Sequence, residues 1–284
     1  MPFLNRSRKQ PAEMLGVKEN RRGFILLSAL VVLILLVAVL APAITPQDPT
    51  ETHMTLAFER PGPGHIMGTD RLGRDMFSRV IAAAHISVPA TLALVAIILT
   101  AGTALGILAG YFGGVLDAVI MRIADMMISF PGMVLAIAVA GFMGASITGA
   151  IIAIAVVSWT KYARLARSLT LKIRHEDYVA AALTTGSRTG HILWRYMLPG
   201  VLPTMVVTAA SDIGGMMLEL AGLSFLGFGA QPPNPEWGLM LSEGRPFFIT
   251  RPWLIVYPGL AITVVVSVFN LWGDSLRDVL DPKA

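Results

Sequence analysis

The stretch from Val80 to Leu116 contains no charged side chain, and this restricts what the chain can fold into more than any other feature. Phe24 to Ile44 is also free of charge, and about 20 apolar residues suffice for a helix to cross a bilayer. Backbone groups in lipid must bond to one another, so such segments cross as helices. Charged residues make up only 14% of the chain, against about 25% in soluble domains. The sequence therefore predicts an all-α, polytopic membrane protein.

Six transmembrane helices are expected. The first has an alternative interpretation, because Ala41-Pro42-Ala43 is similar to the small-residue cleavage site of a signal peptide. Its apolar run is longer than the roughly 7–15 residues of a signal core, which favours an uncleaved anchor. The third contains Ser129-Phe130-Pro131-Gly132 and is expected to kink there. The expected spans cover about residues 24–44, 88–110, 118–141, 149–164, 201–223 and 254–273.

Lysine and arginine are distributed unevenly between the segments that join these spans. With the N-terminus inside, only a minority of the 22 Lys and Arg residues lie outside, namely Arg60, Arg71, Arg74, Arg79, Arg245 and Arg251. Cytoplasmic segments of membrane proteins carry an excess of Lys and Arg, so both termini are predicted to be cytoplasmic. On the outer side, Trp237 and Trp253 are expected in the interfacial aromatic belt.

The outer segment before the second span contains a group of charged residues, Asp70, Arg71, Arg74 and Asp75. Asp70 is expected to cap a helix that lies along the outer membrane interface. Two interpretations remain open for these four residues. They pair with one another or with lipid headgroups, or they form a contact for an external protein that delivers a ligand.

Two carboxylates, Asp212 and Glu219, fall inside the fifth span. They are two helical turns apart and share a face, and a charge inside a bilayer costs about 2.5–3.5 kcal/mol. That face is therefore expected to meet a polar cavity or a helix interface, as the lining of a substrate pathway or as a structural site with neutralising partners. Arg122 and Asp125, one turn apart in the third span, are expected to form a helix-end ion pair or to snorkel towards the interface rather than to take part in transport. Small residues favour close packing of the fifth span, namely Gly214, Gly215, Ala221 and Gly222.

Several classes of function are excluded by what the sequence lacks. The chain has no cysteine, so disulfides and thiolate metal sites are absent. No lysine follows a glycine, so there is no phosphate-binding loop, and the histidines have no paired metal spacing. We therefore predict no catalytic residue, no metal site and no cofactor. The basic residues lie between apolar spans without interleaved aromatic residues, which argues against nucleic-acid binding.

A polar island from Asp177 to Pro199 interrupts the apolar chain on its cytoplasmic side. Its first half is rich in alanine and favours a helix, and Gly186 suits the left-handed residue that ends one. The second half is amphipathic, and Pro199 is expected to stop it. Two short helices bent at a glycine are typical of a docking element for a soluble partner.

This polar island resembles the cytoplasmic EAA loop of ABC-transporter permeases, in which an acidic residue, an Ala pair, a Gly and a Leu-Pro recur. Three other segments resemble the C-type permease of dipeptide, oligopeptide and nickel importers. They are Gly68-Thr69-Asp70 through Asp75, Phe225 through Gly238, and Gly273 through Pro282. The resemblance covers about residues 20–284. The chain departs from the family at Ala180, where an acidic residue is usual, and at Tyr196, which is often His.

The resemblance implies a permease subunit of an ATP-driven importer in the prokaryotic cell membrane. Its partners would be a homologous second permease, two cytoplasmic ATPase subunits, an external substrate-binding protein and membrane lipid. Residues 1–22 would be a cytoplasmic tail, 23–86 an anchor with an external loop, 87–278 the transport domain with a coupling loop at 165–199, and 279–284 a second tail. Contact with the ATPase is expected from Asp177, Ala181, Ala182, Gly186, Leu198 and Pro199.

The cargo remains open at this point. Importers of dipeptides, oligopeptides, nickel and nickel chelates share the four motifs, and peptides are the broader class. Two functions of other classes are also open, a secondary transporter and a structural membrane protein. A secondary transporter is expected to carry inverted repeats with broken helices at matching positions, and the sequence shows no convincing pair.

Overall fold

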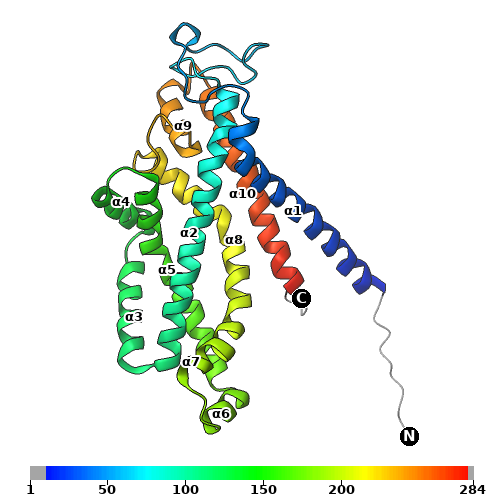
Figure 1. Ribbon diagram of the computed structural model, residues 1–284, viewed down its shortest axis with the longest axis vertical. Helices are drawn as coiled ribbons and strands as arrows, with labels where there is room; N and C mark the ends of the chain where they lie inside the picture. Colours follow the sequence, from blue (N-terminus) through cyan, green and yellow to red (C-terminus); the bar gives the residue numbers. More distant parts are fainter. Residues whose placement is uncertain (1–10, 281–284) are drawn as a thin grey trace.

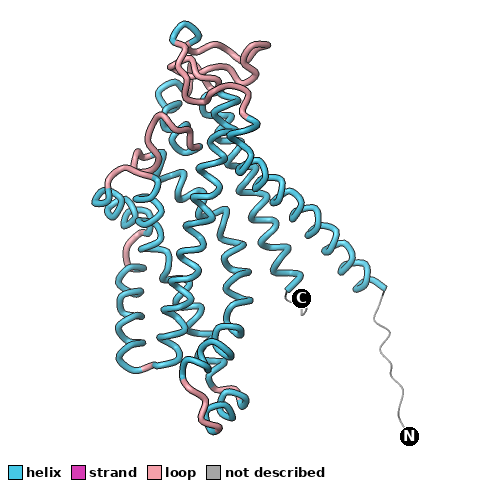
Figure 2. The backbone as a smooth tube through the Cα atoms, viewed as in Figure 1, coloured by secondary structure: helices cyan, strands magenta, loops and turns pink. Residues whose placement is uncertain are grey.

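The computed structural model describes residues 11–280, and every regular element in that range is helical. The long helices run alternately up and down, with the 45–75 loop at one end and α6 and α7 at the other (Figure 1). Figure 2 shows that most loops lie towards these two ends, and that the break between α3 and α4 lies near mid-height. The α-helices are α1 Pro11–Ile44, α2 Met76–Phe112, α3 Gly114–Ile128, α4 Gly132–Met143, α5 Ile147–Arg174, α6 Asp177–Thr184, α7 Thr189–Ile192, α8 Leu198–Phe225, α9 Trp237–Gly244 and α10 Trp253–Leu280.

Within residues 11–280, five helices are long and apolar enough to cross a membrane, and a sixth span results if α3 and α4 are counted as one. The axes of α3 and α4 are bent by 98° at the Ser129–Pro131 break. Pro131 has no backbone N–H for helical pairing, and Gly132 begins the next helix. The all-α membrane architecture and the expected kink are confirmed, although the third span is a sharply broken pair rather than one helix.

The start of α2 differs from the sequence expectation. Asp75, not Asp70, is the N-cap, and its carboxylate accepts a hydrogen bond from Ser78 N at 2.7 Å. Asp70 instead accepts from Leu72 N at 2.8 Å and Arg74 N at 3.0 Å, which closes a tight turn before the helix. The expected interfacial helix is therefore the first part of α2, which runs on into the bundle.

The closest packing in the bundle joins α2 to α5 through three glycines. A Cβ atom at Gly102 would lie 2.5 Å from the nearest atom of α5, and one at Gly110 would lie 2.8 Å from its nearest α5 atom. At Gly106 the added Cβ atom would lie 2.4 Å from Ala163 O. Glycines four residues apart form a smooth strip along α2 that lets the two backbones approach. Facing them, α5 carries the small residues Ala163 and Ala166, which are fully buried.

The helix that contains Pro199 does not stop there, contrary to the sequence expectation. The chain is helical from Thr189 to Phe225, with a π-helical turn at Leu193–Met197 immediately before Pro199. A proline removes a helical hydrogen bond and its ring crowds the preceding turn, and the wider π turn offers room for that ring. α7 and α8 are thus one continuous structure that connects the polar island to the bundle.

Candidate functional site

A polar cavity of about 560 Å³ lies among α5, α8 and α10. The amine of Lys161 on α5 donates to both carboxylate oxygens of Asp212 on α8, at 2.7 and 2.8 Å. The hydroxyl of Tyr162 donates to the same carboxylate at 3.0 Å. Asp212 is therefore held by two neighbouring α5 residues. The other lining residues are Ser158, Thr160, Ser211, Gly215, Met216, Glu219, Asn270 and Asp274.

Glu219 lines the same cavity two turns along α8, which confirms that Asp212 and Glu219 share a face that meets a polar space. Among the described residues, no ion pair or hydrogen bond reaches the Glu219 carboxylate. The cavity lining contains three carboxylates, with Asp274 as the third, and a single ammonium group from Lys161. Its formal charge is therefore negative.

α8 and α10 meet beside this cavity by close backbone contact. A Cβ atom at Gly214 would lie 2.2 Å from the Asn270 side chain, and one at Gly273 would lie 2.6 Å from Ser211 Cα. The close packing expected at Gly214 is confirmed. A Cβ atom at Gly215 would meet nothing within 4 Å, so this glycine is not required for packing in the chain alone.

Sequence reasoning missed Lys161, Tyr162, Asn270 and Asp274 as cavity residues. The expected fourth span ended near residue 164, whereas α5 continues to Arg174, so Lys161 lies within a long helix instead of at its end. A lysine inside an apolar helix was the available signal for Lys161. Asn270 and Asp274 are one turn apart on α10, but nothing in the sequence places them beside α8.

Asp125 pairs with Arg164 of α5, so the predicted Arg122–Asp125 ion pair is wrong. Its neighbour along α3, Asp117, is bound by both the Nε and Nη2 atoms of Arg167. The spacing within α3 permitted a local pair, but the packing of α3 beside α5 supplies a closer cation.

The polar island forms two short helices joined by a turn at the end of the molecule opposite the 45–75 loop (Figure 1). Gly186 has a φ of 82°, which confirms the left-handed residue expected there. Gly186 N donates to Leu183 O and Ser187 N donates to Ala182 O, each at 3.0 Å. This pair of bonds is a Schellman motif, which satisfies the last carbonyls of α6.

The island is anchored by a few apolar side chains and otherwise faces outward. Val179 and Ile192 are fully buried, and Ala182 is nearly so. Of the residues expected to contact an ATPase, Asp177, Ala181, Gly186 and Pro199 are exposed and Leu198 is half-buried. Large apolar side chains are also exposed there, namely Tyr178, Leu183 and Trp194.

The two departures from the family pattern have clear positions in the island. Ala180 is exposed on α6, and Glu176 and Asp177 at the start of that helix are exposed acidic residues. The ring of Tyr196 lies 5.9 Å from that of Tyr178 and 6.1 Å from that of His191. Tyr196 thus joins the two halves of the island through aromatic contacts.

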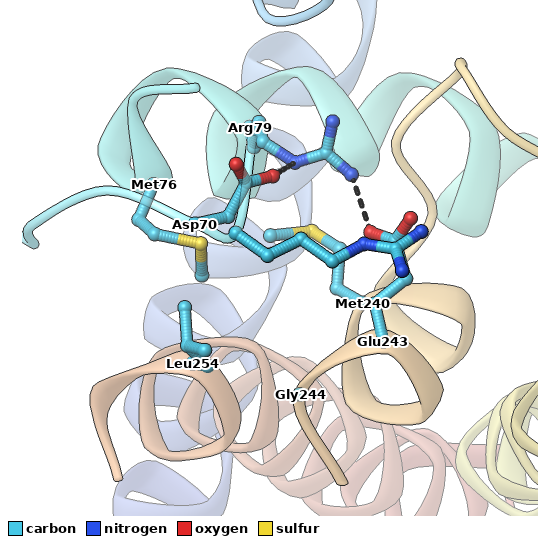
Figure 3. A pocket seen from close by; sticks show the side chains of 8 residues that line it. Asp70, Met76, Arg79, Met240, Glu243, Gly244 and Leu254 are labelled. Carbon is cyan, nitrogen blue, oxygen red and sulfur yellow. Dashed lines mark hydrogen bonds and ion pairs between the residues drawn. The ribbon is translucent and has the colours of Figure 1, made fainter. Parts of the chain in front are cut away.

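The charged group before α2 is part of a buried cluster, in which Asp70 lies beside Arg79 and Glu243 (Figure 3). Asp70, Arg74 and Asp75 are 2–6% exposed, which leaves almost no side-chain surface for an external protein. Arg74 Nε donates to Asp70 at 2.6 Å, and His65 Nδ1 lies 2.8 Å from Asp75. Of the four residues considered as a partner contact, Arg71 alone is exposed.

Arg79 of α2 and Glu243 of α9 complete this cluster, and sequence reasoning missed both. Arg79 Nη2 donates to Glu243 at 2.9 Å, and its Nε lies 3.5 Å from Asp70 (Figure 3). The two arginines and the two carboxylates are buried, and each of these charges has a partner of opposite sign, as charges removed from water require. The cluster therefore fastens the 45–75 loop and the start of α2 to α9.

The loop before α9 holds a second buried carboxylate, Glu236. Its oxygens accept from Gly238 N at 3.0 Å and Leu239 N at 2.8 Å, so Glu236 is the N-cap of α9. Burial raises the pKa of Glu236, and these two hydrogen bonds oppose the rise. The adjacent Trp237 is buried and donates to Val80 O at 3.0 Å, so its expected place in an exposed aromatic belt is wrong.

A family model for the "Binding-protein-dependent transport system inner membrane component" matches residues 102–284, more than half of the chain. The chain belongs to this family. The match contains the cavity residues, the polar island and α8 to α10 together. It confirms the resemblance to importer permeases and makes the chain a multi-pass component of the bacterial inner membrane.

Relatives of this inner membrane component are permease subunits of several importers. The dipeptide permease of Haemophilus influenzae is 41% identical over 94% of this chain and 92% of its own length. The glutathione permease of Pectobacterium atrosepticum is 44% identical over 79% of this chain and 75% of its own. The nickel permease of Escherichia coli is 39% identical over 89% of this chain and 91% of its own.

A solved structure of the MetNI methionine ABC transporter shares the fold, with a TM-score of 0.58 and 17% identity. The likeness covers 72% of this inner membrane component and 97% of that chain. Within the described residues, no group of three or more His, Asp and Glu side chains is placed to hold a metal ion.

Proposed function

We propose that this permease forms half of the translocation pathway of an ATP-driven importer of dipeptides or short oligopeptides. The cavity among α5, α8 and α10 carries this proposal. Its volume of about 560 Å³ falls within the range of about 300–1,000 Å³ that small-molecule sites occupy. It presents an ammonium group and several carboxylates, and a peptide carries the complementary carboxylate and ammonium at its two ends. Relatives named for dipeptide and glutathione transport support this class of cargo.

The polar island would connect the pathway to ATP hydrolysis, which we assign to separate subunits. Its exposed surface combines Asp177, Ala181 and Gly186 with the apolar side chains of Leu183 and Trp194. Such a surface suits a cleft in a soluble partner, because small residues permit close approach and apolar residues gain from burial. Leu198 and Pro199 lie where α7 continues into α8, so movement of the island would reach the cavity directly.

The coupling assignment is tested by co-purifying the ATPase subunits with this chain in mild detergent. Deletion of 177–199, or the point change Ala181→Arg, is expected to abolish or weaken that association while the protein remains in the membrane. Thr52→Arg is a matched control, because Thr52 is exposed at the opposite end of the molecule. Undiminished recovery of ATPases with the deleted chain would overturn the assignment.

Cargo is tested by uptake in proteoliposomes that hold the assembled importer with its external binding protein. Uptake of a labelled dipeptide that requires ATP is the expected result, and Asp212→Asn and Glu219→Gln are expected to reduce it without loss of the ATPases. Uptake of Ni²⁺ or a nickel chelate in place of peptide would favour the nickel alternative, which the similarity to the nickel permease motivates. Uptake without ATP would instead indicate a secondary transporter. If no solute is taken up, the result would favour a structural membrane protein.

A further inference from the structure

α5 carries three basic residues at a spacing of three, and each is paired with an aspartate of another helix. Lys161 pairs with Asp212 of α8, while Arg164 and Arg167 pair with Asp125 and Asp117 of α3. We call these three contacts the α5 ion-pair ladder. The partners are 51, 39 and 50 residues apart in the chain, so each contact is tertiary.

The spacing explains why one helix reaches two neighbours. Three residues advance by about 300° around an α-helix, which is about 60° short of a full turn. Successive members of the ladder are therefore displaced by about 60° around α5. Lys161 and Arg167 are therefore about 120° apart around α5. One end of the ladder faces α8 and the cavity, and the other faces α3.

The ladder lies on the two helices that connect the polar island to the rest of the molecule. α5 ends at Arg174, and α6 begins at Asp177. On the other side, the helix that begins at Thr189 in the island continues through α8, which carries Asp212. The Lys161–Asp212 pair thus joins the two helices that leave the island, and the two arginine pairs join α3 to α5.

We propose that the α5 ion-pair ladder transmits movement of the polar island to the translocation cavity by making α3, α5 and the first part of α8 move as one body. This proposal rests on the proposed function, because it takes the island as the site of ATPase contact. Arg164 and Arg167 are then positioning residues. They are not among the residues that line the cavity, and they lie on α5 rather than in the polar island.

The α2–α5 glycine contacts support this assignment. A Cβ atom at Gly110 would lie 2.8 Å from Thr170 and one at Gly106 would lie 2.4 Å from Ala163, so α2 packs directly on the part of α5 that carries the ladder. Close contacts of this kind resist sliding, because the interface has no side-chain layer that could readjust. We therefore expect this part of α2 to move together with α5.

Charge exchange at Arg167 and Asp117 is the first test, because this pair lies outside the cavity. The assembled importer with its binding protein is reconstituted in proteoliposomes, and substrate molecules taken up per ATP hydrolysed are counted. Arg167→Asp and Asp117→Arg alone are each expected to lower that ratio roughly 2- to 30-fold, the range seen when coupling residues are changed. The double exchange is expected to restore it to within about twofold, since it re-forms the pair in reverse.

Lys172→Asp is the matched control. Lys172 lies on the same helix, is exposed, and has no ion-pair partner among the described residues. It is expected to leave the ratio unchanged. The proposal would be overturned if the single exchanges left the uptake per ATP unchanged. It would also be overturned if the double exchange lowered that ratio as much as the single exchanges do.

A cross-link provides a second test that does not depend on tolerance of reversed charge. The chain has no native cysteine, so Asp117→Cys with Arg167→Cys can be bridged by a short bis-maleimide. If α3 and α5 move as one body, the bridged importer continues to transport. Arrest of transport by the bridge would show that the pair opens during the cycle and would refute the proposal. Failure of the proposed function is separate, since it would appear as ATPases that stay bound after the island is deleted.

Discussion

Arg79 of α2 donates to Glu243 of α9 across 2.9 Å, although the two residues are 164 positions apart in the chain (Figure 3). Arg79 is 1% exposed, and Glu243 also accepts from Arg74 at 3.2 Å. The Glu243 carboxylate therefore bridges two buried cations, both of which also pair with Asp70. The 45–75 loop, the start of α2 and α9 depend on it together.

Removal of this carboxylate is expected to destabilise the end of the protein that carries the 45–75 loop. Glu243→Ala leaves Arg74 and Arg79 with only Asp70 as an anionic partner, and breaking a buried ion pair costs about 3–5 kcal/mol. The melting temperature in detergent is the measurement. Glu59→Gln is the control, because Glu59 is exposed. Equal melting temperatures for the two variants would show that Glu243 is not needed for stability.

The glycine strip on α2 is expected to tolerate no side chain. Gly106→Ala would place a Cβ atom 2.4 Å from Ala163 O and 2.6 Å from Ala166 Cβ, so α2 and α5 would have to separate. Overpacking of this kind costs about 1–3 kcal/mol or more. Gly23→Ala in α1 is the control, since an added Cβ there meets nothing within 4 Å. The yield of monodisperse protein and its melting temperature should fall for Gly106→Ala only.

The turn of the polar island is expected to depend on the left-handed conformation of Gly186. Gly186→Val would hold an L side chain at a φ of 82°, at a cost of about 1–2 kcal/mol. The turn between α6 and α7 would distort, and co-purification of ATPase subunits should weaken. Gly190→Ala in α7 is the matched control, because it has no positive φ and an added Cβ meets nothing within 4 Å. Undiminished co-purification of the ATPase subunits with Gly186→Val would argue against this role of Gly186.

Stability is expected to depend on pH through Glu236. Because burial raises the pKa of Glu236 in the folded protein, the folded state holds this proton more tightly than the unfolded chain. The contribution of Glu236 to stability is therefore greatest at low pH and falls as the pH rises from about 4.3, the ordinary value for Glu, through the raised pKa.

Melting temperatures of the wild type and of Glu236→Gln across this range isolate the effect. Glutamine cannot titrate, so the wild type is expected to lose stability relative to the variant as the pH rises. A difference between them that is constant with pH would contradict the assignment. Other titrating groups affect both proteins alike and cancel in the comparison.

The sequence predicted the membrane class, the break at Ser129–Pro131, the left-handed Gly186 and the shared face of Asp212 and Glu219. Each of these is local, because it follows from helical periodicity, a missing N–H group or a single φ angle. The likeness to importer permeases was also carried by short segments that can be read one at a time. Such features need no knowledge of which helices are neighbours.

The partners of the charged residues were decided by the tertiary structure. Asp125 had a cation one turn away in Arg122 but pairs with Arg164, 39 residues further along the chain. Lys161, Arg79 and Glu243 gave no sequence signal of their partners, because an ion pair between helices depends on how those helices pack. The glycines of α2 were visible at a spacing of four, yet only the fold shows that α5 lies against them. Local sequence sets the shape of each helix, and the free energy of packing selects which charges meet.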